Sequence, residues 1–253
     1  MIQTPVIVTF ANQKGGIGKS TLTILAASWL RYVRGLNVLV VDCDFPQNSI
    51  VELREREKKA VMKNDAYKLM LQRQFERLQK KAYPVIRSTP ENAENDVQVF
   101  LASESEPYDV VLYDLPGTMG TKGVIYTISL LNYLFIPMRA DRLVMQSTLN
   151  FAQTVYDKFV ENPATNIQEV FLFWNMEDRR ERTNIYTLYE RILATLDMKV
   201  YISRIQMRSK FSRELADADG TVYRSTLFRS DGTFLRESGM AALMDEICTT
   251  IGI

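Results

Sequence analysis

Short apolar runs alternate along the chain with longer stretches in which apolar residues recur every three or four positions. The longer stretches have helical spacing and run from Lys19 toward a stop at Gly35, and over Glu91 to Ala102, Thr183 to Leu196 and Gly239 to Ile251. The short runs have the length and β-branched composition of buried strands. They are Val6 to Phe10, Val38 to Val41, Tyr83 to Ile86, Val110 to Tyr113, Tyr133 to Ile136, Val170 to Trp174 and Tyr201 to Ser203. The alternation predicts an α/β fold: a mostly parallel, twisted sheet with helices on both faces and ligands beyond the carboxyl ends of its strands.

The stretch Glu52 to Lys81 is also expected to be helical, but charged residues dominate it. Ten lysines and arginines oppose five acidic residues there. A solvated helix face with ion pairs is one interpretation. A surface for a partner protein or for DNA is the other.

Composition limits the class of protein further. The 253 residues suffice for one large α/β domain, residues 1–253, and no linker divides them. A formal net charge of +1 gives no global argument for nucleic acid, so a DNA surface would need local clustering of basic residues. The longest apolar runs fall short of a membrane span or a signal sequence, which favours a cytoplasmic protein.

The chain has two cysteines, Cys43 and Cys248, and no histidine. This excludes zinc sites built from Cys and His, and histidine acid–base chemistry. The cysteines form no C-x-x-C signature of an iron–sulfur site. Cys43 is expected to be a buried strand residue.

The chemistry is concentrated in the loop between the first strand and the first helix, Lys14-Gly15-Gly16-Ile17-Gly18-Lys19-Ser20-Thr21. A Walker A loop reads G-x-x-x-x-G-K-[ST], and its first glycine falls here on Gln13. The remaining glycines still supply a flexible backbone that leads into a helix N-terminus, which attracts phosphate. The order of strand, loop and helix favours a phosphate-binding loop over a glycine-rich hairpin.

With the added Lys14, the loop resembles the deviant Walker A ATPases of the ParA/MinD type, whose signature is K-G-G-x-G-K-[ST]. The resemblance continues through Asp42-Cys43-Asp44 and Tyr108 to Gly117, and more weakly through Ile136-Pro137, Asn175 and Ile205 to Glu214. It implies a P-loop NTPase that binds ATP and Mg²⁺ and hydrolyses ATP. The backbone of Gly15, Gly16, Ile17 and Gly18 would cradle the phosphates. Lys19 would contact the β- and γ-phosphates, Ser20 the Mg²⁺ and Thr21 the α-phosphate.

Three carboxylates follow strands and complete the implied catalytic site. Asp114 matches the Walker B position, where a carboxylate holds the metal through water. By resemblance, Asp44 orients the attacking water and Asp42 supports the metal. A cap on a helix or turn is the alternative for both Asp42 and Asp44, and Phe45 is an insertion relative to the family's D-x-D-P-Q.

Further residues are assigned by the resemblance. Lys14 would cross a two-fold axis to the partner's phosphates, so that ATP holds a homodimer together. Gly117, in preference to Gly120, would present its N–H to the γ-phosphate. Asn175 would contact adenine, with a turn or cap as its alternative role. Gln206 replaces the family's proline near the base, which leaves the second wall of the adenine pocket unassigned.

A group of basic residues late in the chain is the candidate DNA surface. Its members are Arg204, Arg208, Lys210 and Arg213. Family members that position DNA bind it non-specifically through comparable segments, and such binding would be sensitive to salt. A scattered, solvated basic surface is the alternative.

The leading hypothesis is therefore a weak ATPase that dimerises with ATP and acts in DNA partition, segregation or conjugative transfer, together with non-specific DNA and an activating partner protein. One alternative is a MinD-like switch that positions proteins or cycles on membranes. The last helix has no Lys or Arg up to Ile253, which argues against membrane targeting. A small-molecule ligase or kinase on the same fold is the remaining alternative.

Overall fold

The computed structural model describes residues 4–118, 120–178, 180, 184–215 and 220–253. The strands within these ranges are β1 (Val6–Phe10), β2 (Val38–Asp42), β3 (Val85–Arg87), β4 (Val110–Asp114), β5 (Tyr133–Met138), β6 (Glu169–Glu177) and β7 (Val200–Gln206). They form a sheet in the order β3-β2-β4-β1-β5-β6-β7, and all recorded pairings are parallel. The predicted α/β fold with a parallel sheet is confirmed.

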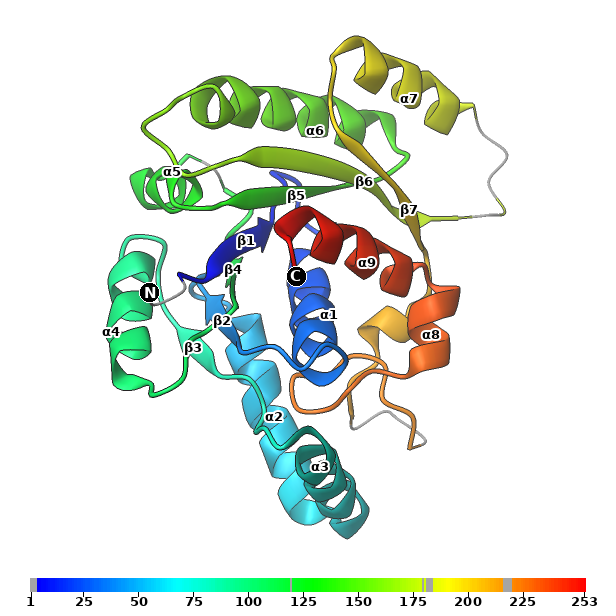
Figure 1. The fold of residues 1–253 in the computed structure, drawn as a ribbon. Coiled ribbons are helices and arrows are strands. Elements are labelled where there is room, and N and C mark those ends of the chain that lie inside the picture. The colour runs from blue at the N-terminus through cyan, green and yellow to red at the C-terminus, as the bar shows by residue number, and fades with distance from the viewer. Residues whose placement is uncertain (1–3, 119, 179, 181–183, 216–219) are drawn as a thin grey trace.

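Helices cover both faces of this sheet (Figure 1). They are α1 (Lys19–Tyr32), α2 (Ser49–Lys63), α3 (Asp65–Leu78), α4 (Ala93–Ser103), α5 (Lys122–Ser129), α6 (Arg142–Val155), α7 (Ile185–Thr195), α8 (Gly232–Glu237) and α9 (Met240–Ile251). A π-helical turn, Tyr156–Val160, extends α6, and a 3-10 turn, Ser209–Ser212, follows β7.

The strands are apolar on both sides because both sides are buried. On one side, alternate residues such as Val40 and Leu112 pack against α1, α8 and α9. On the other, Val41 and Tyr113 pack against α4, α5 and α6. A smaller apolar cluster joins α2 and α3 to Leu215 and to residues 222–228, and this pair of helices projects from the sheet (Figure 1).

The stretch Glu52 to Lys81 is helical as predicted, but it is broken into α2 and α3 at Asn64. This residue has an extended backbone, with φ −132° and ψ 111°, and its side-chain oxygen accepts hydrogen bonds from the N–H groups of Ala66 and Tyr67. Asn64 is therefore the N-cap of α3. The chain turns back there, so the charged stretch becomes a helical hairpin.

Several element ends differ from those predicted. β5 extends through Pro137, and β6 runs past Asn175. The pairing of β1 with β5 ends at Phe135. Pro137 therefore has no strand partner on its β1 side, and the N–H group that a proline lacks is not needed there. α4 begins at Ala93 rather than Glu91. The predicted helix from Thr183 to Leu196 is seen as α7, and position 183 itself lies outside the described residues.

Cys43 and Cys248 are both buried and free. Burial was expected for Cys43, but the residue lies one position past the end of β2 rather than within it. Burial raises the pKa of the Cys43 thiol, so it stays protonated at neutral pH. Within the described part of the chain, no helix is both long and apolar enough to cross a membrane.

Candidate nucleotide site

The site lies at the carboxyl end of the central strand β1, where the chain turns into α1. Gly16 and Gly18 have φ values of +73° and +84°, a left-handed conformation that strains any residue with a Cβ atom. Gly18 is also the N-cap of α1 and supplies no side-chain cap. The first N–H groups of α1 are therefore available to an anion.

Asn12 holds this loop in place. Its side-chain nitrogen donates to the Pro137 carbonyl (2.9 Å) and to the Thr148 hydroxyl (2.8 Å), and its side-chain oxygen accepts from the Lys14 N–H (3.0 Å). Asn12 is 1% exposed, so these hydrogen bonds are shielded from water. The start of the loop is thereby fixed to β5 and α6, while the Lys14 side chain is exposed.

Asp114 lies beneath the loop at the end of β4. It is fully buried, and both carboxylate oxygens lack a hydrogen-bond partner among the described residues. Burial raises the pKa of Asp114 to about 7, while the neighbouring Ser20 hydroxyl and Lys19 ammonium act in the opposite direction. A buried carboxylate without partners is costly unless a cation accompanies it. Hydroxyl and carboxylate oxygens are the ligands that Mg²⁺ prefers, so Ser20 and Asp114 fit a magnesium ion.

Asp42 is engaged differently. One carboxylate oxygen accepts hydrogen bonds from the N–H groups of Ile50 and Val51, both at 3.0 Å, and the other lies 3.4 Å from the Asp44 N–H. Burial raises the pKa of Asp42, and these backbone hydrogen bonds oppose the rise. Asp42 therefore caps α2, the alternative weighed from sequence, and Ser20 and Asp114 are the better-placed metal pair.

The segment after β4 folds toward the loop. A Cβ atom on Gly117 would lie 3.3 Å from the Lys19 ammonium nitrogen, whereas one on Gly120 would have no neighbour within 4 Å. Gly117 therefore lies beside Lys19, and its contact with the γ-phosphate stays a prediction. Asp42 pairs with Asp114 across the β2–β4 ladder, and the charges of Asp42 and then Asp44 add to the rise in the pKa of Asp114.

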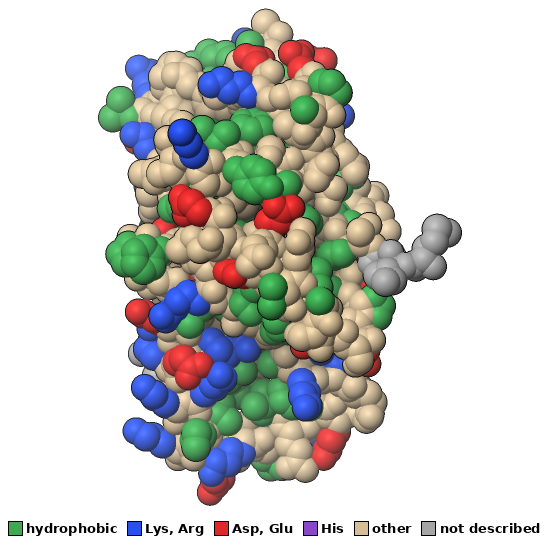
Figure 2. Space-filling model, turned by 90° about the vertical axis from the view of Figure 1, so that its left-hand side faces the viewer, with side chains coloured by type: hydrophobic (Ala, Val, Ile, Leu, Met, Phe, Trp, Pro, Cys, Tyr) green, Lys and Arg blue, Asp and Glu red, His purple; other side chains and the backbone are tan. Residues whose placement is uncertain are grey.

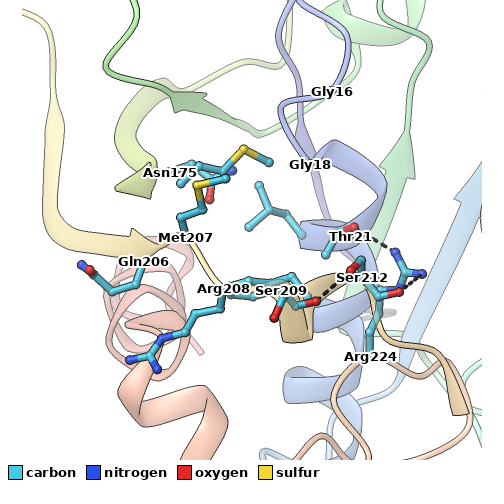
Figure 3. A pocket seen from close by; sticks show the side chains of 13 residues that line it. Gly16, Gly18, Thr21, Asn175, Gln206, Met207, Arg208, Ser209, Ser212 and Arg224 are labelled. Atoms are coloured by element: carbon cyan, nitrogen blue, oxygen red, sulfur yellow. Dashed lines mark hydrogen bonds between the residues drawn. The ribbon is translucent and has the colours of Figure 1, made fainter. Parts of the chain in front are cut away.

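A pocket of about 440 Å³ adjoins the loop (Figure 3). Its lining includes Gly16, Gly18, Thr21 and Asn175 on one side. The side chain of Asn175 donates to the Ile17 carbonyl (2.8 Å), so this residue braces the loop as well as facing the pocket. The size suits a nucleoside.

The opposite wall, which the sequence left unassigned, comes from the last residue of β7 and the segment after it. It consists of Gln206, Met207, Arg208, Ser209, Phe211 and Ser212. Gln206 stands at the start of this wall and bonds the Glu177 carboxylate. A polar residue thus stands where the family has a proline. Met176 and Met207 supply the apolar surface of the pocket.

Arg224 closes the pocket and was not expected to belong to the site. Its guanidinium donates to the Thr21 hydroxyl (3.3 Å), the Ser212 carbonyl (3.5 Å) and the Glu214 carboxylate (3.1 Å), as Figure 3 shows for Thr21 and Ser212. No motif marks this residue in the sequence. It brings a positive charge to the first turn of α1.

The predicted DNA residues lie near this wall in different settings. Arg204 forms ion pairs with Glu177 and Glu190, which offset its charge. Arg208 lies 3.9 Å from the Glu237 carboxylate, and Lys210 lies over the Tyr223 ring. Arg213 is exposed. The cationic surface is therefore carried by Arg208, Lys210 and Arg213 more than by Arg204.

A parallel sheet with a glycine loop, a lysine and a buried carboxylate at its carboxyl edge defines a P-loop nucleotide-binding protein. Residues 8–222 match the CbiA family, the CobQ/CobB/MinD/ParA nucleotide-binding domain, and the chain belongs to this family. It has the ATPase fold of the ParA/MinD proteins. A comparison with curated protein sequences found no significant match.

Solved structures share the fold. A plasmid partition protein from Borrelia burgdorferi B31 bound to AMPPNP has a TM-score of 0.61 at 18% identity, over 96% of this chain and 100% of that chain. A chain of the MinC:MinD cell division complex of Aquifex aeolicus has a TM-score of 0.60 at 18% identity, over 99% of this chain and 96% of that chain. Cobyrinic acid a,c-diamide synthase from Mycobacterium smegmatis with bound ADP and magnesium has a TM-score of 0.54 at 19% identity, over 81% of this chain and 88% of that chain.

Proposed function

We propose that the protein is an ATP-dependent switch: two chains dimerise around bound ATP and Mg²⁺, hydrolyse the ATP slowly and then separate. The observation that carries the proposal is the loop itself, with the exposed Lys14 beside its glycines and the unpartnered Asp114 carboxylate beneath Ser20. Related structures contain AMPPNP, or ADP with magnesium, which supports the choice of ligands.

The residues have distinct tasks in this proposal. The N–H groups of the loop and Lys19 hold the phosphates, and Asn175 and the segment after β7 hold the nucleoside. Asp44 orients the attacking water. Mg²⁺ held by Ser20 and Asp114 would offset charge on the outer phosphates. Hydrolysis then depends mainly on positioning, since phosphoryl transfer needs little covalent help from the protein.

The surface around the loop supports dimerisation. Phe45, Leu143 and Met207 are 65%, 79% and 55% exposed, and they follow the carboxyl ends of β2, β5 and β7. Because the strands are parallel, these apolar side chains share the edge of the sheet that carries Lys14. Exposed apolar residues on a common face are typical of an interaction surface, and a two-fold contact there would bring Lys14 to the partner's phosphates.

Light scattering and ATP turnover test the switch. With ATP and Mg²⁺ we expect dimers, and we expect Asp44→Ala to accumulate them while its turnover falls about 100-fold. Lys14→Ala is expected to remain monomeric, whereas Lys158→Ala, which removes an exposed lysine outside the loop, should behave as wild type. An ATP-bound monomer, or unchanged turnover in Lys14→Ala, would overturn the proposal.

We further propose that the ATP-bound dimer binds DNA non-specifically and acts in partition, segregation or conjugative transfer with an activating partner protein. Arg208, Lys210 and Arg213 lie in or beside the segment that forms the pocket wall, so nucleotide binding and the basic surface share one segment. Dimerisation would double that surface.

A gel-shift experiment with duplex DNA tests this part. We expect a shift that requires ATP, weakens as salt rises and is lost in Arg208→Ala/Lys210→Ala/Arg213→Ala. Lys59→Ala/Lys63→Ala/Lys158→Ala removes the same charge elsewhere and should retain the shift. Absence of a shift at low salt with ATP and Mg²⁺ would remove DNA from the proposal and leave the dimer untouched.

A further inference from the structure

A second hollow, of about 320 Å³, lies on the projecting α2–α3 hairpin. Its lining residues are Met70, Arg73, Gln74, Arg77, Phe228 and Arg229. None of them lines the nucleotide pocket. Figure 2 shows Lys and Arg side chains gathered on the half of the molecule where α2 and α3 lie.

The floor of the hollow is apolar and firmly held. Gln74 is 9% exposed, and its side-chain amide donates to the Leu227 carbonyl (2.9 Å) and accepts from the Arg229 N–H (2.8 Å). The Phe228 ring packs against Tyr67 with centroids 6.0 Å apart. The amide thus satisfies the backbone that crosses α3. Half-buried Met70 supplies the accessible apolar surface of the floor, because the Phe228 ring is itself only 1% exposed.

Three arginines surround this floor. Arg73 and Arg77 are one helical turn apart on α3. Arg229 comes from the segment that crosses α3 and is bonded to Gln74. All three are exposed, and no ion pair is recorded for them within the described ranges. The intervening Glu76 accepts a hydrogen bond from Gln72 instead.

Three other cations of the same hairpin are already paired. Arg56 contacts Glu214, Lys58 contacts Glu55 and Lys68 contacts Asp65, each at 2.8 Å. Lys59 and Lys63 on α2 are also exposed and have no recorded ion pair within the described ranges, but neither lines the hollow, where three such arginines gather. A concave apolar floor bordered by unpaired guanidinium groups is complementary to a ligand that is both acidic and apolar.

We propose that this hollow is a docking site for an acidic segment of a partner protein. Carboxylates of the segment pair with Arg73, Arg77 and Arg229, whose planar guanidinium groups match carboxylates in a bidentate manner. An aromatic or aliphatic side chain between those carboxylates enters the hollow and contacts Met70. Buried apolar anchors and arginines are the residues that dominate protein interfaces.

Duplex DNA fits this surface less well. Its charged backbone is convex and presents no apolar group that would fill a concave floor. A phosphate chain would use the arginines but leave Met70 without a role. The apolar floor is therefore what selects an acidic protein segment over DNA.

Fluorescence anisotropy with labelled acidic polymers tests the proposal on the full-length protein. We expect a poly(Glu,Tyr) copolymer to bind about tenfold more tightly than poly-Glu of matched length, because only the copolymer carries an apolar anchor. The variant Arg73→Gln/Arg77→Gln/Arg229→Gln should bind the copolymer about tenfold or more weakly than the wild type. The matched control, Lys59→Gln/Lys63→Gln/Lys158→Gln, should retain most of the binding.

Four results would overturn the proposal: no copolymer binding to the wild type, equal binding of the two polymers, equal weakening by the control, or unchanged binding in the arginine variant. Loss of duplex DNA binding in the arginine variant with copolymer binding retained would assign the surface to DNA. ATP-dependent dimerisation, measured in parallel, tests the proposed switch separately.

Discussion

Arg224 connects the first turn of α1 to a segment 203 residues further along the chain. Its side chain is only 18% exposed, and its Nε is buried without a partner among the described contacts. A guanidinium in this position can hold Thr21 in place and offset the negative charge of a bound nucleotide. It is the clearest example of a site residue that no motif in the sequence indicates.

We predict that Arg224→Gln weakens ADP and ATP binding by about tenfold, because a charge-assisted contact near the phosphates is lost. Arg224→Lys keeps the charge but lacks the planar guanidinium, so its nucleotide affinity should lie between those of the wild type and Arg224→Gln. Isothermal titration with each nucleotide measures the effect. Arg236→Gln, which removes an arginine that bonds Thr233 on α8, serves as the control. Equal affinities for Arg224→Gln and wild type would show that the arginine is structural only.

The sequence predicted the residues whose chemistry is local and missed those that depend on folding. Gly18, Lys19 and Asp114 belong to short patterns that follow strands, and the structure brings them together. Asn12 and Arg224 act through partners more than a hundred residues away, and no spacing along the chain records such contacts.

At the scale of elements, the break at Asn64 shows how a local signal is hidden by composition. The charged residues on both sides favour helix equally, so the pattern reads as one stretch, yet a single capping side chain divides it. The ends of β5 and β6 were missed for another reason. The length of each strand depends on how far a neighbouring strand continues beside it. Only the assembled sheet determines this.

The junction between β7 and α9 depends on Gly239. It has a φ of +82°, and a Cβ atom there would lie 2.1 Å from the Arg204 carbonyl oxygen. We predict that Gly239→Ala lowers the free energy of unfolding by more than about 3 kcal/mol, because both the backbone and β7 must shift. Urea denaturation measures the change.

Gly252 provides the control for this substitution. Its φ is +77°, but a Cβ atom would meet nothing within 4 Å. Gly252→Ala should therefore cost only about 1 to 2 kcal/mol, the strain of the left-handed conformation alone. Similar losses in the two variants would mean that the close approach to Arg204 is relieved at little cost.

Thr226 anchors α2 to the late part of the chain. It is fully buried; its hydroxyl accepts from Arg54 (2.7 Å) and donates to Glu57, whose carboxylate also accepts the Thr226 N–H (2.9 Å). Burial raises the pKa of Glu57, and hydrogen bonds from Ser225 and Thr226 oppose the rise. The network thus keeps two charged side chains buried with partners.

We predict that Thr226→Val lowers the free energy of unfolding by about 2 to 3 kcal/mol, since the shape is kept while Arg54 and Glu57 each lose a partner. Thr249→Val, at an exposed position on α9, is the control and should change stability by less than about 0.5 kcal/mol. Chemical denaturation of both variants gives the comparison. Equal effects would mean that water replaces the lost hydroxyl.

At the scale of the whole molecule, residues 222–229 form a strap between the nucleotide pocket and the α2–α3 hairpin. Arg224 contacts Thr21 at one end, Thr226 is held by Arg54 and Glu57, and Gln74 clamps Leu227 and Arg229 at the other. Because these contacts lie on one short segment, ordering the pocket is expected to order the hairpin as well.

Hydrogen exchange followed by mass spectrometry tests this coupling. We expect AMPPNP with Mg²⁺ to slow exchange in the glycine loop, the strap and α3, and to leave α7 unchanged, because α7 packs on the opposite face of the sheet. In Arg224→Gln, saturated with the same ligand, protection of the loop should persist while protection of the strap and α3 is reduced. Protection confined to the loop in the wild type would show that the strap does not transmit nucleotide binding, and equal protection of α3 in both proteins would show that Arg224 is not the link.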